Sequence, residues 1–443
     1  MKTYRLLIVS RCSNPHGGAD RIIADLCRNL PHHGWEVTLG LTKGASFNDP
    51  EGYRSVYPDL PIVEIDGTLG TRSSRLTAIK KVIDEVRPDV VLSMRVFDAY
   101  EVVAKEKQNR GIRLVVGVRA FEDDYLSDVK RYRDHIDGCV TSGKLVAEAC
   151  CRFANLERQR VISIAGGVHA PECAVSRQPI VGRPVRLLYA GRIEKEQKRC
   201  QDLPLLLAEL ERRSIEFELD VAGTGPSESE LRNQLSQFGD RHAIRFHGWV
   251  DRETLYRDQY RKADLFVHFA AWEGVTIAPR EAMAHGCVPV ISRFPGLVTE
   301  GQFVDETNCL TFPVGDPVAA AGCVERLVGE PELITRLSEQ AKRSQSGCYS
   351  FDGSIVAWDA AFRSWLDAPM RSGVVPVINE KLPGRLTDLG VPASVQNTFR
   401  KWAGRPVRHR SPGSEWPTSS GLLTDDESRQ IDQIRSEAIG TAT

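Results

Sequence analysis

Short apolar runs alternate with stretches of helical periodicity over most of the chain. The strand-like runs of the first half lie at 6–9, 37–41, 90–94, 112–118 and 138–141. Between them, apolar residues recur every three or four positions, which predicts amphipathic helices. One such helix carries Ile22, Ile23, Leu26, Cys27 and Leu30 and is expected to stop at Gly34. This alternation is typical of a parallel sheet covered by helices, so the predicted class is α/β.

A second series of the same kind follows a connector that contains proline and arginine at about 171–184. Its strands are expected at 187–190, 217–221, 244–246, 265–268 and 288–291. We therefore predict two facing doubly wound, Rossmann-like domains. Sheets of this type bind ligands past the carboxyl ends of their strands, so the site is expected in the cleft between the domains.

The predicted organisation has four parts. Residues 1–180 form the first domain, 181–349 form the second, and 350–369 form a closing helix that returns to the first domain. Residues 370–443 are rich in proline, glycine and serine and carry a basic patch at Arg405, Arg408 and Arg410. A capping box from Thr424 to Glu427 predicts one more helix there. This last stretch is interpreted as a partly ordered appendage.

Composition and charge narrow the class of protein. The chain has 443 residues, 58 Lys and Arg against 59 Asp and Glu, and 41% hydrophobic residues, as in a soluble globular protein. A net charge of −1 gives no global electrostatic reason to expect nucleic acid. The eleven cysteines are scattered without any CxxC spacing, which indicates reduced, mostly buried thiols and a cytoplasmic location. The first ten residues are too short an apolar stretch for a signal peptide or a spanning helix, so they are interpreted as a strand.

The most informative segment is 269–291, in which a strand end, a Glu-Gly loop, a helix and another strand follow one another. Pro279 suits the first turn of the helix. The free N–H groups around Val275 and Thr276, with the helix dipole, form a ready anion site. Glu273 precedes the helix and Glu281 lies within it, so two carboxylates flank that site.

These features suit a nucleotide sugar, with its diphosphate over the helix N-terminus and its sugar and ribose hydroxyls on the two carboxylates. Two glutamates at this spacing also occur by chance in most chains of this length. A retaining glycoside hydrolase would need its two carboxylates about 5 to 5.5 Å apart on opposing surfaces, which a flanking arrangement argues against. A dinucleotide dehydrogenase is disfavoured because no G-x-G-x-x-G follows the first strand.

The sequence resembles the retaining glycosyltransferases of the GT-B fold in family four, the glycosyltransferase group 1 type. Glu273 and Glu281 match the family's Glu-x7-Glu motif, and the segment AGRIEKEQKR places Arg192 and Lys198 at the family's diphosphate-binding positions. The glycine-rich turn at 221–231, Asp264 before a strand, and the stretch 308–316 are also similar, although Cys309 replaces a glycine of the family pattern. The resemblance covers roughly 5–365.

The resemblance implies a metal-independent hexosyltransferase without a cofactor. Its donor would be a UDP-sugar, with a GDP-sugar as the second choice, and its acceptor a hydroxyl of a glycan, a lipid-linked glycan or a small molecule. The first domain would bind the acceptor and the second the nucleotide sugar. The implied catalytic residues are Arg192, Lys198 and Glu273. The implied donor-binding residues are Gly17, Gly18, Gly274, Val275, Thr276 and Glu281.

The chain departs from the family at one position near the reacting sugar. Many members carry a histidine after the strand at 112–118, where this chain has Arg119. A guanidinium cannot act as a base at neutral pH, but it can bind a phosphate or an acceptor carboxylate. Arg119 and His16, which lies beside the glycine pair, are therefore predicted acceptor or phosphate contacts.

Two other functions stay open at this point: a sugar-nucleotide epimerase on the same fold, and a non-catalytic partner of another transferase. A peripheral contact with the inner face of a membrane is also considered. A helix with Arg75, Lys80 and Lys81 opposite its apolar stripe could touch anionic lipid, and an ordinary solvated helix face is the alternative.

Overall fold

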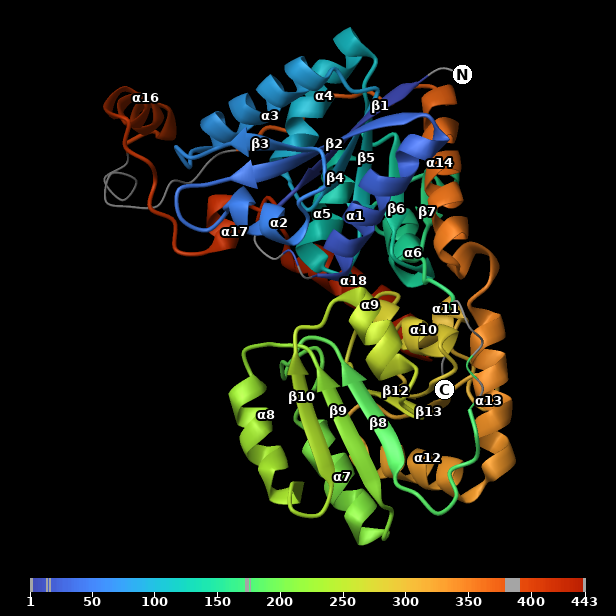
Figure 1. Cartoon of the computed structure of the whole chain (residues 1–443). Helices are drawn as coiled ribbons and strands as arrows, with labels where there is room; N and C mark the ends of the chain where they lie inside the picture. The colour runs from blue at the N-terminus through green and yellow to red at the C-terminus, as the bar shows by residue number, and fades with distance from the viewer. Residues whose placement is uncertain are drawn as a thin grey trace. The chain divides into compact units, whose positions relative to one another are not determined.

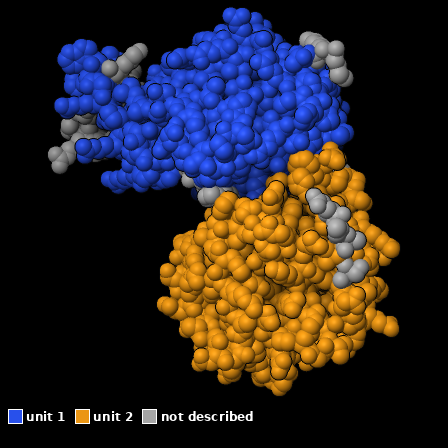
Figure 2. Space-filling model, viewed as in Figure 1, with its two compact units in different colours: residues 1–142, 146–164, 355–434 blue, residues 143–145, 165–354, 435–443 orange. Residues whose placement is uncertain are grey.

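The computed structural model describes residues 3–12, 15, 17–171, 175, 177–378 and 391–440. The chain forms two compact units, each built from more than one segment (Figure 2). Unit 1 comprises residues 1–142, 146–164 and 355–434, and unit 2 comprises 143–145, 165–354 and 435–443. Each unit contains one parallel sheet with helices packed against it (Figure 1). The predicted α/β class with two Rossmann-like domains is thus confirmed.

Unit 1 holds a seven-stranded parallel sheet in the order β3-β2-β1-β4-β5-β6-β7. Its strands are β1 (Tyr4–Ser10), β2 (Trp35–Lys43), β3 (Ile62–Asp66), β4 (Val90–Met94), β5 (Arg113–Val118), β6 (Gly138–Thr141) and β7 (Val161–Ser163). Its helices include α1 (Gly18–Asn29), α2 (Pro50–Val56), α3 (Arg72–Val86), α4 (Asp98–Arg110) and α5 (Asp123–Tyr132). Helix α6 (Lys144–Arg152) begins in unit 2 and continues in unit 1.

Unit 2 holds a six-stranded parallel sheet in the order β10-β9-β8-β11-β12-β13. Its strands are β8 (Val185–Ala190), β9 (Phe217–Ala222), β10 (Ala243–Gly248), β11 (Leu265–His268), β12 (Val288–Ser292) and β13 (Leu310–Phe312). Its helices include α7 (Asp202–Arg212), α8 (Glu228–Leu235), α9 (Arg252–Thr254), the π-helix η4 (Leu255–Tyr260), α10 (Ile277–Ala284), α11 (Leu297–Glu300), α12 (Pro317–Gly329) and α13 (Pro331–Ser344).

The two faces of the unit 2 sheet have separate apolar cores. On one face, Leu187, Val221 and Val267 pack with apolar residues of α7, α12 and α13. On the other face, Leu188 and Phe266 pack with residues of η4 and α10. Helices η4 and α10 are therefore fixed by burial of their apolar sides against the sheet.

Residues 355–434 group with unit 1. The units change at 164/165, whereas the sequence predicted a limit near 180. Helix α14 (Phe351–Asp367) enters unit 1 from Ile355 onward. The tail is no separate appendage, since helices α16 (Ala393–Ala403), α17 (Pro412–Glu415) and most of α18 (Asp425–Gly440) group with unit 1.

Buried side chains attach this tail to unit 1. The Trp416 indole is fully buried and donates a hydrogen bond to the Lys43 carbonyl oxygen at 3.0 Å. The Glu415 carboxylate accepts hydrogen bonds of 2.8 to 3.0 Å from the backbone N–H groups of Ser46, Phe47 and Asn48. The predicted capping box is confirmed, because Thr424 and Glu427 bond each other's backbone N–H groups at 3.2 Å.

Within the described residues, the predicted burial of most cysteines and the predicted N-terminal strand are confirmed. Of the nine cysteines whose side chains are described, seven are buried. The first apolar run is strand β1. Among the described residues, no helix combines the length and the apolar character that crossing a bilayer requires.

Asp128 on α5 ties the tail to unit 1 at a pH-dependent contact. Its buried carboxylate accepts a hydrogen bond from the Ser420 N–H at 2.7 Å and a second one from the Ser420 hydroxyl. Burial raises the pKa of Asp128 to about 6, although the Ser420 hydrogen bonds act in the opposite direction. The folded protein therefore keeps a proton that the unfolded chain releases near pH 4, so this carboxyl lowers stability as the pH rises from 4 to 6.

The Asp128→Asn variant is expected to be more stable than the wild type above pH 6, by roughly 2 kcal/mol, because an amide accepts from the Ser420 N–H without a buried charge. Thermal denaturation between pH 4.5 and 7.5 should show a melting temperature about 5 °C higher at pH 7.5 and little difference at the acid end. Asp240→Asn, at an exposed position of unit 2, is the control and should leave the profile unchanged. Parallel profiles for wild type and Asp128→Asn would contradict the assignment.

Candidate functional site

The candidate site of unit 2 lies at the carboxyl ends of β8 and β11. These two strands are neighbours at the point where the strand order reverses, which is where open α/β sheets bind ligands. The loop after β8 carries Arg192 and Lys198. Strand β11 ends at His268, and Glu273 lies in the loop between β11 and α10.

Backbone hydrogen bonds hold the loop after β8 in one conformation. The Glu194 carboxylate accepts hydrogen bonds from the N–H groups of Gln197 at 3.0 Å and Lys198 at 2.7 Å. The Ile193 N–H donates to the Thr224 carbonyl oxygen at 3.0 Å, which joins this loop to the turn after β9. A Cβ on Gly225 would lie 2.1 Å from the Ile193 carbonyl oxygen, so the two loops approach as closely as only glycine permits.

Lys198 and Glu273 form an ion pair in which the ammonium donates to Oε1 of the carboxylate. The His268 Nε2 atom lies 3.5 Å from the same carboxylate oxygen. Burial would raise the pKa of Glu273, but the Lys198 charge and His268 outweigh it and hold that pKa well below its usual range. Burial lowers the pKa of His268, so its imidazole is neutral at pH 7. The pair is therefore an ionised carboxylate with one cation beside it.

Gln197 connects the basic loop to the acidic loop. Its Nε2 donates to the Trp272 carbonyl oxygen at 3.1 Å, and its own carbonyl oxygen accepts from the Ala271 N–H at 2.8 Å. Its Oε1 accepts from the Arg192 guanidinium at 3.2 Å. The Arg192 side chain is more than half exposed, so most of its guanidinium donors face solvent. The Lys198–Glu273 ion pair and the contacts of Gln197 thus bring Arg192, Lys198 and Glu273 together.

The N-terminus of α10 follows directly after this cluster. Thr276 is the N-cap residue and is buried, yet its side chain makes no capping hydrogen bond. The first turn of a helix leaves its N–H groups without partners inside the helix, and the dipole adds partial positive charge there. Gly274 and Val275 link Glu273 to this turn. Phosphate oxygens could be bound here by backbone N–H groups together with Arg192 and Lys198.

Glu281 lies within α10 and contacts a different set of residues from those around Glu273. It is buried, and its two carboxylate oxygens accept hydrogen bonds from Tyr256 at 2.8 Å and Tyr260 at 3.2 Å. Both tyrosines belong to η4, and π-helical turns occur frequently at functional sites. A ribose at the Glu281 carboxylate would share its oxygens with these phenols.

Sequence reasoning missed the tyrosines of η4, Gln197 and His268. Tyr256 and Tyr260 stand four residues apart in a stretch with no recognisable motif. His268 ends a predicted strand, and that position at a carboxyl end was the one signal that could have singled it out.

The predicted site residues of unit 1 lie at the starts and ends of its elements. Gly17 is the N-cap of α1 with a φ of −76°, and Gly18 is the first residue of that helix. His16 lies outside the described residues. The Arg119 guanidinium donates to the carbonyl oxygens of Ile164 at 3.0 Å and Thr141 at 3.4 Å, and burial lowers its pKa to about 10. Arg119 thus stays charged at pH 7 and braces the ends of β6 and β7.

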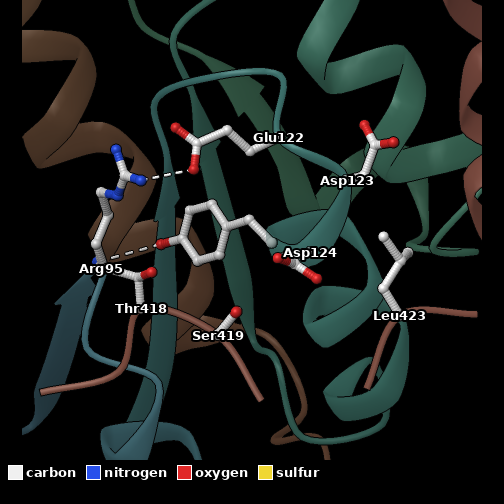
Figure 3. A pocket seen from close by; sticks show the side chains of 8 residues that line it. Arg95, Glu122, Asp123, Asp124, Thr418, Ser419 and Leu423 are labelled. Carbon is white, nitrogen blue, oxygen red and sulfur yellow. Dashed lines mark hydrogen bonds and ion pairs between the residues drawn. The ribbon is translucent and has the colours of Figure 1, made fainter. Parts of the chain in front are cut away.

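Unit 1 also has a polar pocket of about 270 Å³ past the carboxyl ends of β4 and β5. Figure 3 shows the Arg95 guanidinium turned toward Glu122, with 2.6 Å between the paired atoms. The Tyr125 hydroxyl accepts from the Arg95 N–H at 3.2 Å, and Arg95 has a φ of 64°, which is rare for a non-glycine residue. The lining residues are Arg95, Glu122, Asp123, Asp124, Tyr125, Thr418, Ser419 and Leu423. The tail therefore supplies one wall of this pocket.

The described residues contain no group of three or more His, Cys, Asp and Glu side chains arranged to hold a metal ion.

Comparisons with known proteins find similarity to glycosyltransferases. Residues 184–330 match the family described as glycosyl transferases group 1. A GDP-mannose:cellobiosyl-diphosphopolyprenol alpha-mannosyltransferase of Xanthomonas oryzae is 28% identical over 303 residues, which is 64% of this chain and 76% of that protein. An alpha-D-kanosaminyltransferase of Streptomyces kanamyceticus is 24% identical over 57% of this chain, and the match spans 61% of that protein's length.

Solved structures show the same fold. The lipopolysaccharide outer core galactosyltransferase WaaB matches with a TM-score of 0.62 and 16% identity over 81% of this chain and 99% of its own. The Anabaena protein HepE in complex with UDP-glucose matches with a TM-score of 0.66 and 15% identity over 82% and 99%. The chain thus has the two-domain GT-B fold, its residues 184–330 match the group 1 glycosyl transferases, and together these findings support a glycosyltransferase with a nucleotide-sugar donor.

Proposed function

We propose that the chain is a retaining, metal-independent hexosyltransferase of family four that uses a UDP-sugar or a GDP-sugar. The observation that carries this proposal is the cluster of Arg192, Lys198 and Glu273 directly before the free N-terminus of α10. The names of similar proteins support both nucleotides, since the Xanthomonas relative is named for GDP-mannose and the Anabaena structure contains UDP-glucose.

The proposed donor site separates the charges that the reaction needs. Arg192, Lys198 and the helix N-terminus would bind the diphosphate and stabilise the negative charge that grows on it as the bond to the sugar breaks. These cations supply the field that a metal ion supplies in other transferases, which supports metal independence. Glu273 stays ionised, so it can accept a sugar hydroxyl and stabilise positive charge at the anomeric carbon, but it has no proton to donate.

The proposed sugar transfer needs no protein side chain to act as a base. The bond between the anomeric carbon and the β-phosphate oxygen breaks, and a bond to the acceptor hydroxyl oxygen forms on the same face of the sugar. The proton of that hydroxyl passes to the leaving phosphate oxygen. This route suits a site in which position 119 carries a guanidinium that cannot take a proton.

For the acceptor we propose a hydroxyl of a glycan, which a lipid carrier could hold. The names of the similar proteins include a diphosphopolyprenol acceptor and a lipopolysaccharide core. The pocket of Figure 3 adds carboxylates and the hydroxyl groups of Thr418 and Ser419, which are suitable partners for sugar hydroxyls.

The test is an assay of the full chain with UDP- and GDP-sugars, with and without sugar acceptors, that follows nucleotide release and the anomeric configuration of the product. We expect acceptor-dependent release, a retained configuration and no loss of rate in EDTA. Arg192→Ala should lower the rate, while Arg186→Ala, at an exposed position of β8, is the control. Release without acceptor would instead indicate an epimerase or a hydrolase. Donor binding without turnover would indicate a non-catalytic protein. Binding is measured by thermal shift, since a ligand at a hundred times its Kd adds about 2.7 kcal/mol of stability.

A further inference from the structure

Helix α16 in the tail presents an apolar face to solvent. Val395, Phe399 and Trp402 recur at helical spacing, and their exposed fractions are 57%, 57% and 84%. The rings of Phe399 and Trp402 lie next to each other, with 6.2 Å between their centroids. Figure 1 shows α16 standing apart from the strands of its own unit. A helix face with aromatic side chains this exposed marks an interaction surface.

The same segment is strongly basic. Residues 391–413 contain five arginines and lysines and no aspartate or glutamate. Arg405, Arg408 and Arg410 are exposed, and the side chain of none of the three forms an ion pair with another described residue. No acidic residue within 391–413 compensates these three cations.

The basic segment is anchored to unit 1 between its arginines. Val407 is buried, and its N–H donates to the Leu69 carbonyl oxygen at 3.0 Å. The His409 Nε2 atom lies 2.8 Å from the Gly70 carbonyl oxygen. These contacts attach the segment to unit 1, while Arg408 and Arg410 stay exposed to solvent.

Helix α3, which the sequence offered as a membrane-contacting helix, does not have such a surface. Arg75 is buried and pairs with Asp98 at 2.5 Å. Lys80 lies 3.2 Å from Asp84 and 3.1 Å from Glu106. These carboxylates neutralise the Arg75 and Lys80 cations, which favours the alternative of an ordinary helix face over a lipid contact.

We propose that α16 and the basic segment after it, residues 393–410, dock on an anionic lipid bilayer. Val395, Phe399 and Trp402 would enter the interface between headgroups and acyl chains, where tryptophan is favoured, and the arginines would contact acidic headgroups. A second copy of the chain is a poorer occupant because it would bring an identical cluster of positive charge. Nucleic acid would satisfy the arginines but not the aliphatic Val395. The proposal goes beyond the proposed function and does not require it.

The experiment is flotation of the full chain with vesicles of phosphatidylcholine alone and of phosphatidylcholine with 30% phosphatidylglycerol. We expect binding to the acidic vesicles only, weakened by salt. Replacing Arg405, Arg408 and Arg410 together by glutamine should weaken binding about a hundredfold, since each cation near the surface contributes roughly a factor of five. Trp402→Ser should weaken it about tenfold. Brominated lipid should quench wild-type fluorescence more than that of Trp402→Phe.

Matched controls replace residues of the same kind elsewhere on the surface. Leu205→Ser removes an exposed apolar side chain of α7, and Lys81, Arg212 and Arg257 replaced together by glutamine remove three exposed cations. Both controls should bind vesicles as the wild type does. The proposal would be overturned if the arginine variant bound vesicles as the wild type does, or if the protein bound neutral vesicles alone. It would also be overturned if the protein bound no vesicles and instead formed a dimer or an RNA complex that α16 variants abolish. Donor binding measured on the same samples keeps this outcome separate from the proposed transfer.

Discussion

Lys198→Met is expected to lower kcat by about 10² to 10³ and to destabilise unit 2 by about 2 to 3 kcal/mol. The loss of rate follows from removing one positive group at the place where the leaving diphosphate gains charge. The loss of stability follows because Glu273 is buried and its main cation disappears, which leaves an uncompensated carboxylate. Steady-state kinetics and thermal denaturation measure the two effects on the same preparation.

The control for this variant is Lys195→Met in the same loop. Lys195 pairs with Glu230 at 2.7 Å, and both side chains are nearly half exposed, so little stability or rate should be lost. The double variant Lys198→Met with Glu273→Gln removes the charge as well as its partner, and it should recover much of the stability without recovering the rate. Unchanged kcat in Lys198→Met would exclude this lysine from the reaction.

Gly225→Ala is expected to destabilise unit 2 by about 3 kcal/mol and to weaken donor binding by at least tenfold. The added Cβ would meet the Ile193 carbonyl oxygen at 2.1 Å and its backbone nitrogen at 2.7 Å, so the loop that carries Arg192 must move. Backbone atoms cannot turn aside as a side chain can, and a shift of about 1 Å in positioning groups is enough to impair catalysis.

The matched control is Gly329→Ala at the end of α12, where a Cβ meets nothing within 4 Å. It should leave donor binding unchanged and keep or raise the melting temperature, because alanine favours the helix more than glycine does. Titration of UDP and GDP against both variants by calorimetry separates a misplaced loop from general unfolding. Wild-type affinity in Gly225→Ala would show that the turn after β9 does not position the donor loop.

The parts of the site that the sequence predicted are those encoded within short segments. Glu273, the start of α10 and Lys198 follow strand ends, and a parallel sheet brings such ends to one edge. Most strands could also be predicted, because a parallel strand that is buried on both faces has a continuous run of apolar residues. Shorter or less apolar strands such as β3, β7 and β13 gave no comparable pattern.

The parts that the sequence did not predict depend on contacts between distant positions. The Tyr256 and Tyr260 hydroxyls reach Glu281 from 25 and 21 residues away, and no local periodicity encodes that meeting. The compensation of Arg75 by Asp98 likewise depends on how α3 packs against α4. The tail looked like an appendage because its polar composition hides a few buried anchors, Trp416 above all.

The docking of Trp416 on Lys43 joins positions 373 residues apart and has a consequence for biosynthesis. The opening strands leave the ribosome long before the indole that covers them, whereas residues 165–354 form an uninterrupted stretch that is finished earlier. During translation the sheet of unit 2 can therefore fold before the core of unit 1 has received the Trp416 side chain. In a living cell the nascent N-terminal half is the portion that chaperones must shield until Trp416 emerges.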